Sequence, residues 1–186
     1  MLLSRDVLKD LVLKGLVTKY SGLDGQLTAN GIDVRLAGVV EIVDGGRLAV
    51  SKVDNVVPRL GKAFVLKGYE SRLSGYDISQ TVVSKSVRLE RLKPYFVFTC
   101  EEVNTPPNLM FHISARTSLF RLTQSLLGCT IGEAGYRGFL TFMLLPFLDC
   151  ELELGARFAQ FSFSELKGVA HYEQQKESNY QGGKLF

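Results

Sequence analysis

The chain has 186 residues, with 22 basic and 19 acidic side chains and a formal net charge of +3. Hydrophobic residues make up 46% and charged residues 22%, which is ordinary for a folded globular protein and argues against global disorder. The net charge is too small for a protein that coats nucleic acid, so no nucleic-acid partner is expected. The length suits a single domain over residues 1–186.

The cysteines are odd in number and far apart, at Cys100, Cys129 and Cys150, with no CxxC pair. This spacing predicts neither a zinc ribbon nor a disulfide framework, and two histidines are too few for a multi-His metal site. Free thiols suit a reducing cytoplasm. The first residues are charged too early for a signal peptide, and the apolar run Phe139–Leu148 is too short to span a membrane. We therefore expect a cytoplasmic protein with no membrane partner.

A short helix is predicted at Ser4–Val17. Ser4 is a suitable N-cap, Asp6 lies favourably in the first turn, and apolar residues recur at helical spacing. Gly15 is expected to end the helix.

After this helix the chain changes to short segments rich in β-branched and aromatic residues, separated by Gly, Pro, Asn and Asp. The predicted strands are Ile32–Leu36, Gly38–Val43, Arg47–Val50, Phe64–Leu66, Thr81–Val83, Tyr95–Cys100, Leu109–Ile113, Phe139–Leu145 and Phe158–Phe163. This pattern indicates a mainly β fold, a distorted barrel or jelly roll behind one N-terminal helix. Residues 67–92 lack a strong period and are typical of an extended excursion, and residues 174–186 of a flexible tail.

One candidate site is the segment Ala115–Arg121, in which Arg116 and Arg121 flank the hydroxyls of Thr117 and Ser118. Arginine is the side chain best matched to phosphate oxygens, and hydroxyls add neutral donors. A helix beginning at Thr117 would add free backbone N–H groups. The same residues are also typical of a capped surface helix with solvated arginines, and spacing alone leaves both interpretations open.

A second candidate is the glycine-rich segment Gly132–Gly138, which precedes an apolar run. Its three glycines predict a tight hairpin with backbone open to a ligand, and Glu133 could orient a water molecule there as a general base. A plain hairpin with a solvated glutamate is the alternative.

Two strands carry polar residues at alternating positions. In Phe158–Phe163 the alternation places Gln160 on a polar face, where it would donate to a phosphate or satisfy neighbouring backbone, and assigns Phe161 and Phe163 to the core. Asp33 and Arg35 lie on one face of an earlier strand, and we expect a structural ion pair between them.

Taken together and in this order, the segments resemble the dCTP deaminase and trimeric dUTPase superfamily, especially its archaeal dUTPase branch. The matching segments are Leu2–Asp6, Gly31–Leu36 with its Asp-x-Arg, Arg116–Arg121 as the phosphate motif, Glu133–Gly138 as the hairpin, Gly155–Gln160, and Asn179–Gly182 as the nucleotide-closing tail. The resemblance covers nearly the whole chain except a longer stretch near 50–92.

The resemblance implies a distorted β-barrel or jelly-roll subunit of the dUTPase-like β-clip type. It also implies a homotrimer with active sites between subunits, which bind a deoxypyrimidine nucleoside triphosphate with Mg²⁺ held mainly by its phosphates. Carried over to this chain, the triphosphate would be held by Arg116, Thr117, Ser118, Arg121 and Gln160. The hairpin before Gly135 would read the pyrimidine through its backbone, and Tyr180 and Gln181 would close over the nucleotide.

Two departures from the family pattern bear on the reaction. Deaminases carry a glutamate on the strand after the hairpin, and this chain has Met143, whose thioether cannot transfer a proton. The water-activating aspartate of the dUTPases is replaced by Glu133. We therefore expect a dUTP diphosphatase that releases dUMP and pyrophosphate. A dCTP deaminase and a catalytically silent nucleotide-binding homologue are the alternatives.

Overall fold

The computed structural model describes residues 1–128, 130–170 and 180–186. Its helices are α1 (Arg5–Leu13), α2 (Leu23–Gln26), α3 (Thr117–Thr123) and the short 3-10 turns η1 (Lys52–Asp54) and η2 (Glu70–Leu73). Its strands are β1 (Val17–Thr18), β2 (Ile32–Ile42), β3 (Leu60–Val65), β4 (Ile78–Val83), β5 (Ser86–Leu89), β6 (Tyr95–Thr99), β7 (Glu102–Asn104), β8 (Leu109–Ala115), β9 (Ser125–Gly128), β10 (Ile131–Gly132), β11 (Arg137–Gly138), β12 (Thr141–Pro146), β13 (Cys150–Glu153) and β14 (Arg157–Glu165).

The predicted N-terminal helix is confirmed, although α1 is shorter than expected. Ser4 occupies the N-cap position with extended backbone but makes no capping hydrogen bond through its side chain. The helix ends at Leu13, and Gly15 takes a left-handed conformation, φ +97°, that turns the chain toward β1. Leu8 and Val12 are the buried positions of the helix, which fixes the face that packs on the sheet.

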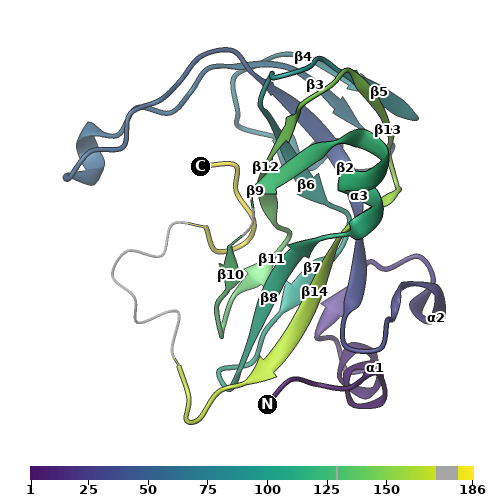
Figure 1. Ribbon diagram of the computed structural model, residues 1–186. Coiled ribbons are helices and arrows are strands. Elements are labelled where there is room, and N and C mark those ends of the chain that lie inside the picture. The colour runs from purple at the N-terminus through teal and green to yellow at the C-terminus, as the bar shows by residue number, and fades with distance from the viewer. Residues whose placement is uncertain (129, 171–179) are drawn as a thin grey trace.

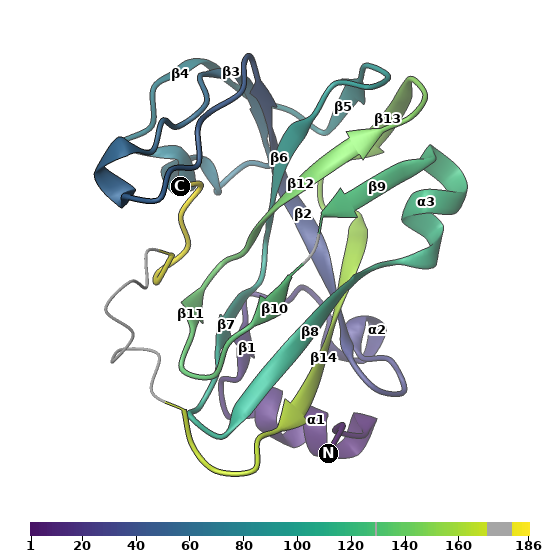
Figure 2. The ribbon, with the colours of Figure 1, turned by 60° about the vertical axis from the view of Figure 1, so that its left-hand side comes forward.

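The strands form a curled, mainly antiparallel sheet, and the predicted mainly β fold is confirmed (Figure 1). The central order is β10-β8-β14-β2-β6-β12-β9, and β3 and β4 extend it from β2. A small sheet, β1-β7-β11, lies beside it, and β13 pairs with β5. β2 and β14 are therefore central strands that join two halves of the curled sheet (Figure 2).

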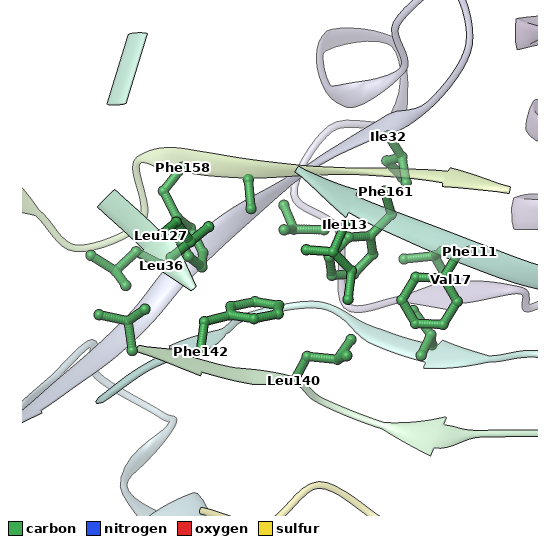
Figure 3. Close-up of a cluster of buried hydrophobic side chains, with 14 of the residues drawn as sticks. Val17, Ile32, Leu36, Phe111, Ile113, Leu127, Leu140, Phe142, Phe158 and Phe161 are labelled. Carbon is green, nitrogen blue, oxygen red and sulfur yellow. The ribbon is translucent and has the colours of Figure 1, made fainter. Parts of the chain in front are cut away.

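Aromatic and aliphatic side chains fill the space inside this curl. Phe111 of β8 and Phe161 of β14 have ring centroids 5.1 Å apart, and Phe142 of β12 lies 6.4 Å from Phe161. Figure 3 shows Leu140 and Phe142 pointing from one layer toward Ile113, Phe158 and Phe161 of the other. Phe161 and Phe163 are fully buried, as the sequence predicts.

Two of the expected strand patterns change in the structure. The predicted segments Ile32–Leu36 and Gly38–Val43 form one strand, β2, because a register shift between Leu36 and Gly38 carries the chain through without a break. A similar shift between Arg157 and Ala159 directs Phe158 into the core beside Ala159, which breaks the strict alternation.

The predicted strand at Arg47–Val50 is wrong. Only an isolated bridge joins Arg47 to Val56 there, within a segment that leaves the sheet between β2 and β3 and carries η1 (Figure 1). Its apolar side chains are exposed, 91% for Leu48 and 91% for Val53. Its β-branched residues are therefore not packed against a neighbouring strand or the core.

The described part of the C-terminal segment is seated against the sheet. The backbone N–H of Leu185 donates to the Tyr76 hydroxyl at 2.9 Å, and the Phe186 ring lies 5.4 Å from that of Phe96. Residues 174–179 lie outside the described residues, and the flexibility of 174–186 and the single domain over 1–186 stay predictions.

Cys100 and Cys150 are free thiols, whereas Cys129 lies outside the described residues. Burial raises the pKa of the Cys100 thiol to about 11. None of the described helices is both long enough and apolar enough to span a membrane.

Phe161→Ala tests the dependence of the fold on this aromatic core. Removing a fully buried ring should lower the free energy of unfolding by about 3–5 kcal/mol, measured as a shift of the urea midpoint. Phe120→Ala, at a side chain 49% exposed on α3, is the matched control and should change the midpoint little. Equal shifts for the two variants would contradict this description of the core.

Candidate active site

The segment Ala115–Arg121 lines a polar cavity of about 620 Å³ at the end of β8. The predicted helix begins at Thr117, as α3. The cavity is lined by Thr28, Asp33, Ser114, Ala115, Arg116, Thr117, Ser118, Arg121, Leu122 and Gln160. Five of these are the residues predicted to hold a triphosphate, and the fold brings all five together.

The register of the central strands explains this convergence. Gln160 of β14 pairs with Asp33 of β2 on one side and with Ser114 of β8 on the other. Directly paired residues on neighbouring strands point to the same face of a sheet. This row of three polar side chains forms the floor of the cavity, and the turn from β8 into α3 carries Arg116 to its rim.

The expected ion pair between Asp33 and Arg35 is wrong. Asp33 Oδ2 instead lies 2.8 Å from Arg116 Nε and 3.5 Å from Arg157 Nη1. Residues two apart on a strand are separated by about 6.6 Å, whereas groups from neighbouring strands and turns approach more closely. The Asp33 side chain is only 3% exposed, so these partners hold a buried charge.

Arg35 is paired with Glu101, a fully buried carboxylate. Arg35 Nε donates to Glu101 Oε1 at 2.7 Å, and the backbone N–H of Arg35 donates to Oε2 at 2.7 Å. Burial disfavours the charged guanidinium, but the hydrogen bond to Glu101 and the negative charge of Glu101, together with smaller contributions from Cys100 and Tyr69, outweigh it and raise the pKa of Arg35. This pair lies outside the residues that line the polar cavity.

The glycine-rich segment makes the predicted tight turn, between β10 and β11, but the prediction of a hairpin is wrong, because β10 pairs with β8 and β11 pairs with β7, in separate sheets. Residues 133–138, the hairpin of the family resemblance, are therefore a turn that connects two sheets. Gly135 has φ +84°, a conformation that favours glycine, and its N–H donates to the carbonyl of Thr105 at 3.1 Å. Glu133 is exposed at the start of the turn. The turn is thus held by its backbone, and in the part of the chain that the structure describes no hydrogen bond engages the Glu133 carboxylate.

Glu133 lines a second cavity, of about 660 Å³, that differs in character from the polar one. Its walls include the rings of Phe96 and Phe142 together with Met143, which is 42% exposed. Thr141 also lines it, and its buried Oγ1 has no hydrogen-bond partner within the described residues. An apolar slot with an unsatisfied hydroxyl and one carboxylate is suited to a flat heteroaromatic ring.

The structure places Tyr180 at this second cavity and Gln181 on the neighbouring turn. Tyr180 lines the cavity, and the Gln181 side chain binds the backbone of the turn, accepting from Arg137 N–H at 2.9 Å and donating to Gly135 O at 3.1 Å. Within one copy of the chain, Tyr180 and Gln181 therefore lie beside the turn that carries Glu133 and away from the phosphate motif.

The two cavities lie at opposite ends of β8. Gly132 pairs with Phe111, and Arg116 lies five residues further along, which corresponds to roughly 16 Å. Glu133 continues from Gly132 in the other direction. Figure 2 shows the same arrangement, with α3 at one end of β8 and the turn between β10 and β11 near the other. One copy of the chain does not bring Glu133 and Arg116 together.

Sequence reasoning missed three polar residues of the polar cavity, namely Thr28, Ser114 and the buried carboxylate of Asp33. Thr28 Oγ1 accepts from Gln160 Nε2 at 3.1 Å. The exposed Ser114 alternates with the buried Ile113, which is a sequence signal that could have been used. Thr28 and Asp33 could not have been found in this way, because their place in the cavity depends on which strands are neighbours in the sheet.

A sequence model of the dCTP deaminase-like family matches residues 2–166. The chain belongs to this family. The resemblance to the dCTP deaminase and dUTPase superfamily is thereby confirmed. The family match includes both the phosphate motif and the turn that carries Glu133.

Several known proteins are similar to this chain or to part of it. A dCTP deaminase of Natronomonas pharaonis is 38% identical over 90 residues, which cover 45% of this chain and 46% of the relative. The crystal structure of a dCTP deaminase from Agrobacterium tumefaciens superposes with a TM-score of 0.62 at 15% identity, over 92% of this chain and 50% of that chain. A dUTPase of Staphylococcus bacteriophage 80alpha gives a TM-score of 0.41 at 16% identity, over 51% of this chain and 83% of that chain. The dCTP deaminase-like chain thus spans about half the length of the first two.

Arg116→Ala tests the polar cavity as an anion site. Losing a charged hydrogen bond should weaken binding of a deoxynucleoside triphosphate by about 1.5–3 kcal/mol, measured by calorimetry. Arg88→Ala removes the same charge from an exposed position of β5 and should leave binding unchanged. Unchanged binding in the Arg116 variant would remove this segment from the site.

Proposed function

We propose that this protein is a dUTP diphosphatase, which hydrolyses dUTP to dUMP and pyrophosphate. The observation that supports this proposal most is that a carboxylate and a thioether line the same cavity, the second one, of about 660 Å³. Among the described residues that line this cavity, Glu133 is the one carboxylate, and Met143 of β12 lines it too. A carboxylate can accept a proton from water, whereas a thioether can neither donate nor accept one at useful pH.

In this proposal the flat apolar cavity takes the pyrimidine, and the polar cavity takes the triphosphate. Arg116, Arg121 and the hydroxyls of Thr117 and Ser118 stabilise charge on the phosphates as water attacks the α-phosphate. Glu133 orients that water and takes its proton. Tyr180 and Gln181 close over the nucleotide from the side of the turn, where Gln181 already binds.

Magnesium is the proposed cofactor, carried by the triphosphate. Mg²⁺ keeps several waters and binds proteins through one or two carboxylates together with substrate phosphates. No group of three or more His, Cys, Asp and Glu residues suited to a metal occurs among the described residues. Such a metal, held mainly by the substrate, would when bound neutralise charge on the phosphate oxygens.

A homotrimer is proposed because, within one copy of the chain, the general base Glu133 and the phosphate motif lie too far apart to act on one nucleotide. A general base must lie within hydrogen-bond reach of the proton it takes. The separation of the two cavities along β8 is much longer than that reach. A second copy that brings its Glu133 turn to the polar cavity of the first would complete the site, in agreement with the family resemblance.

A dCTP deaminase remains the second candidate, because the relative from Natronomonas pharaonis carries that name. Deamination requires proton transfer at the base, and Met143 stands where the deaminases carry a glutamate. The third candidate is a nucleotide-binding homologue without activity, because Glu133 is one methylene longer than the aspartate of the dUTPases. A displacement of about 1 Å can cost about a hundredfold in rate.

Incubation of the purified protein with dUTP and with dCTP separates these candidates. Pyrophosphate from dUTP supports the diphosphatase, and ammonia from dCTP supports the deaminase. Binding of either nucleotide with release of neither product supports the silent homologue.

Glu133→Gln tests the base. The amide keeps the shape, so nucleotide binding should persist while dUTP hydrolysis falls by roughly 10²–10⁴-fold, the range for a lost general base. Glu133→Asp should retain or raise the rate, because it restores the shorter arm. Glu153→Gln, on the exposed face of β13, is the matched control. Undiminished pyrophosphate release by the Glu133→Gln protein would contradict the role of Glu133 as the general base.

Met143→Glu tests the proposed absence of deaminase chemistry. This change alone should yield little ammonia from dCTP, because the reaction also needs supporting groups around the glutamate. Ammonia release at a rate comparable to a deaminase would contradict that expectation.

Light scattering tests the assembly. A homotrimer should show three times the 20.6 kDa mass of the chain at micromolar concentration. A monomer alone under these conditions would count against a site shared between copies.

A further inference from the structure

The polar cavity contains a negative charge at its floor, which is unexpected in a site for an anion. Of the described residues that line it, Asp33 alone is acidic, and it lies beside the arginines and hydroxyls that the proposed function assigns to the triphosphate. Its side chain is only 3% exposed, so solvent does not screen it. A carboxylate in this place opposes phosphate binding by its charge alone, and its presence needs a reason in the geometry.

The contacts of Asp33 give that reason. Oδ2 lies 2.8 Å from Arg116 Nε and 3.5 Å from Arg157 Nη1, and Oδ1 accepts from Gln160 Nε2 at 3.4 Å. Two of these three partners, Arg116 and Gln160, are proposed triphosphate ligands. One buried carboxylate therefore reaches groups from β8–α3 and from β14.

The guanidinium of Arg116 is fixed at two of its nitrogens. Nε faces Asp33, and Nη1 donates to the carbonyl of Arg157 at 3.2 Å. Within the described residues, no hydrogen bond engages its Nη2. A planar guanidinium held along one edge has a defined orientation, and the remaining edge is presented to the cavity that Arg116 lines.

We propose that Asp33 is a positioning residue for the triphosphate: its carboxylate orients Arg116 and Gln160 before the nucleotide arrives. An unrestrained arginine loses its rotamer freedom when it binds phosphate, and prior orientation removes that cost. This inference rests on the proposed function for its ligand. It adds a residue that touches no phosphate and acts through the side chains that do.

Asp33→Asn separates positioning from charge. The amide keeps the shape but removes a negative charge from the cavity, so electrostatics alone would tighten binding of an anion. Positioning requires the opposite, because Arg116 and Gln160 lose their shared acceptor. We expect affinity for inorganic tripolyphosphate and for α,β-imido-dUTP, each measured with and without Mg²⁺, to fall about tenfold or more in both conditions, as the loss of a charged contact would cause. A fall only in the presence of Mg²⁺ would assign Asp33 to the metal and overturn the inference.

A second readout follows Arg116 directly. The Nε–H of Arg116 should exchange slowly with water in the nitrogen NMR spectrum of the wild-type protein and rapidly in Asp33→Asn. Glu101→Gln is the matched control, since Glu101 is a buried carboxylate that holds Arg35 but does not line the cavity. It should leave the affinity and the Arg116 signal unchanged.

The outcomes are distinguishable. A wild-type protein that binds neither probe overturns the proposed function and this inference together. Wild-type binding that Asp33→Asn leaves intact or tightens overturns the inference alone. If Asp33→Asn does not fold, Asp33→Glu is measured in its place. It keeps the charge but moves the carboxylate by one methylene, so its affinity should also fall, and wild-type affinity would overturn the inference.

Discussion

A charge buried in a protein must be surrounded by donors, and Asp33 imposes this constraint on the centre of the sheet. Its carboxylate is satisfied by groups from β14 and from the turn after β8, so the strand order β8-β14-β2 is a condition of its burial. The same order aligns Gln160 with Ser114 and Asp33. The polar cavity thus follows from one electrostatic requirement combined with strand register.

The opposite face of these strands is governed by apolar packing. Phe111, Phe161 and Phe163 come from β8 and β14, the strands that carry the polar row, and they fill the inside of the curl. Because side chains alternate across a strand, each strand serves the core with one set of residues and the cavity with the other. The sheet that holds the fold together therefore also fixes the spacing of the cavity's polar groups.

The sequence predicted the element types well where local chemistry determined them. The helix after Ser4, the tight turn at Gly135 and the helix at Thr117 depend on capping, turn and periodicity signals within a few residues. The hairpin predicted around that turn was wrong, because β10 and β11 pair with β8 and β7 and not with each other. Partners far apart in the chain were beyond reach. Asp33 was assigned to its near neighbour Arg35, whereas its partners Arg116 and Arg157 are set by strand order. The exposed segment at Arg47–Val50 looked like a strand because composition does not report whether a neighbour is available to pair with it.

The separation of Arg116 from Glu133 along β8 has a genetic consequence under the proposed trimer. A copy damaged at Arg116 loses its own phosphate cavity but keeps an intact Glu133 turn that serves a neighbour, and a copy damaged at Glu133 does the reverse. Two alleles that are each inactive alone would then complement one another when expressed together, because some mixed assemblies contain a site built from the two undamaged halves. Two alleles damaged at the same cavity would not complement each other, whereas alleles damaged at different cavities would. The complementation group of a substitution would then report which end of β8 it lies near.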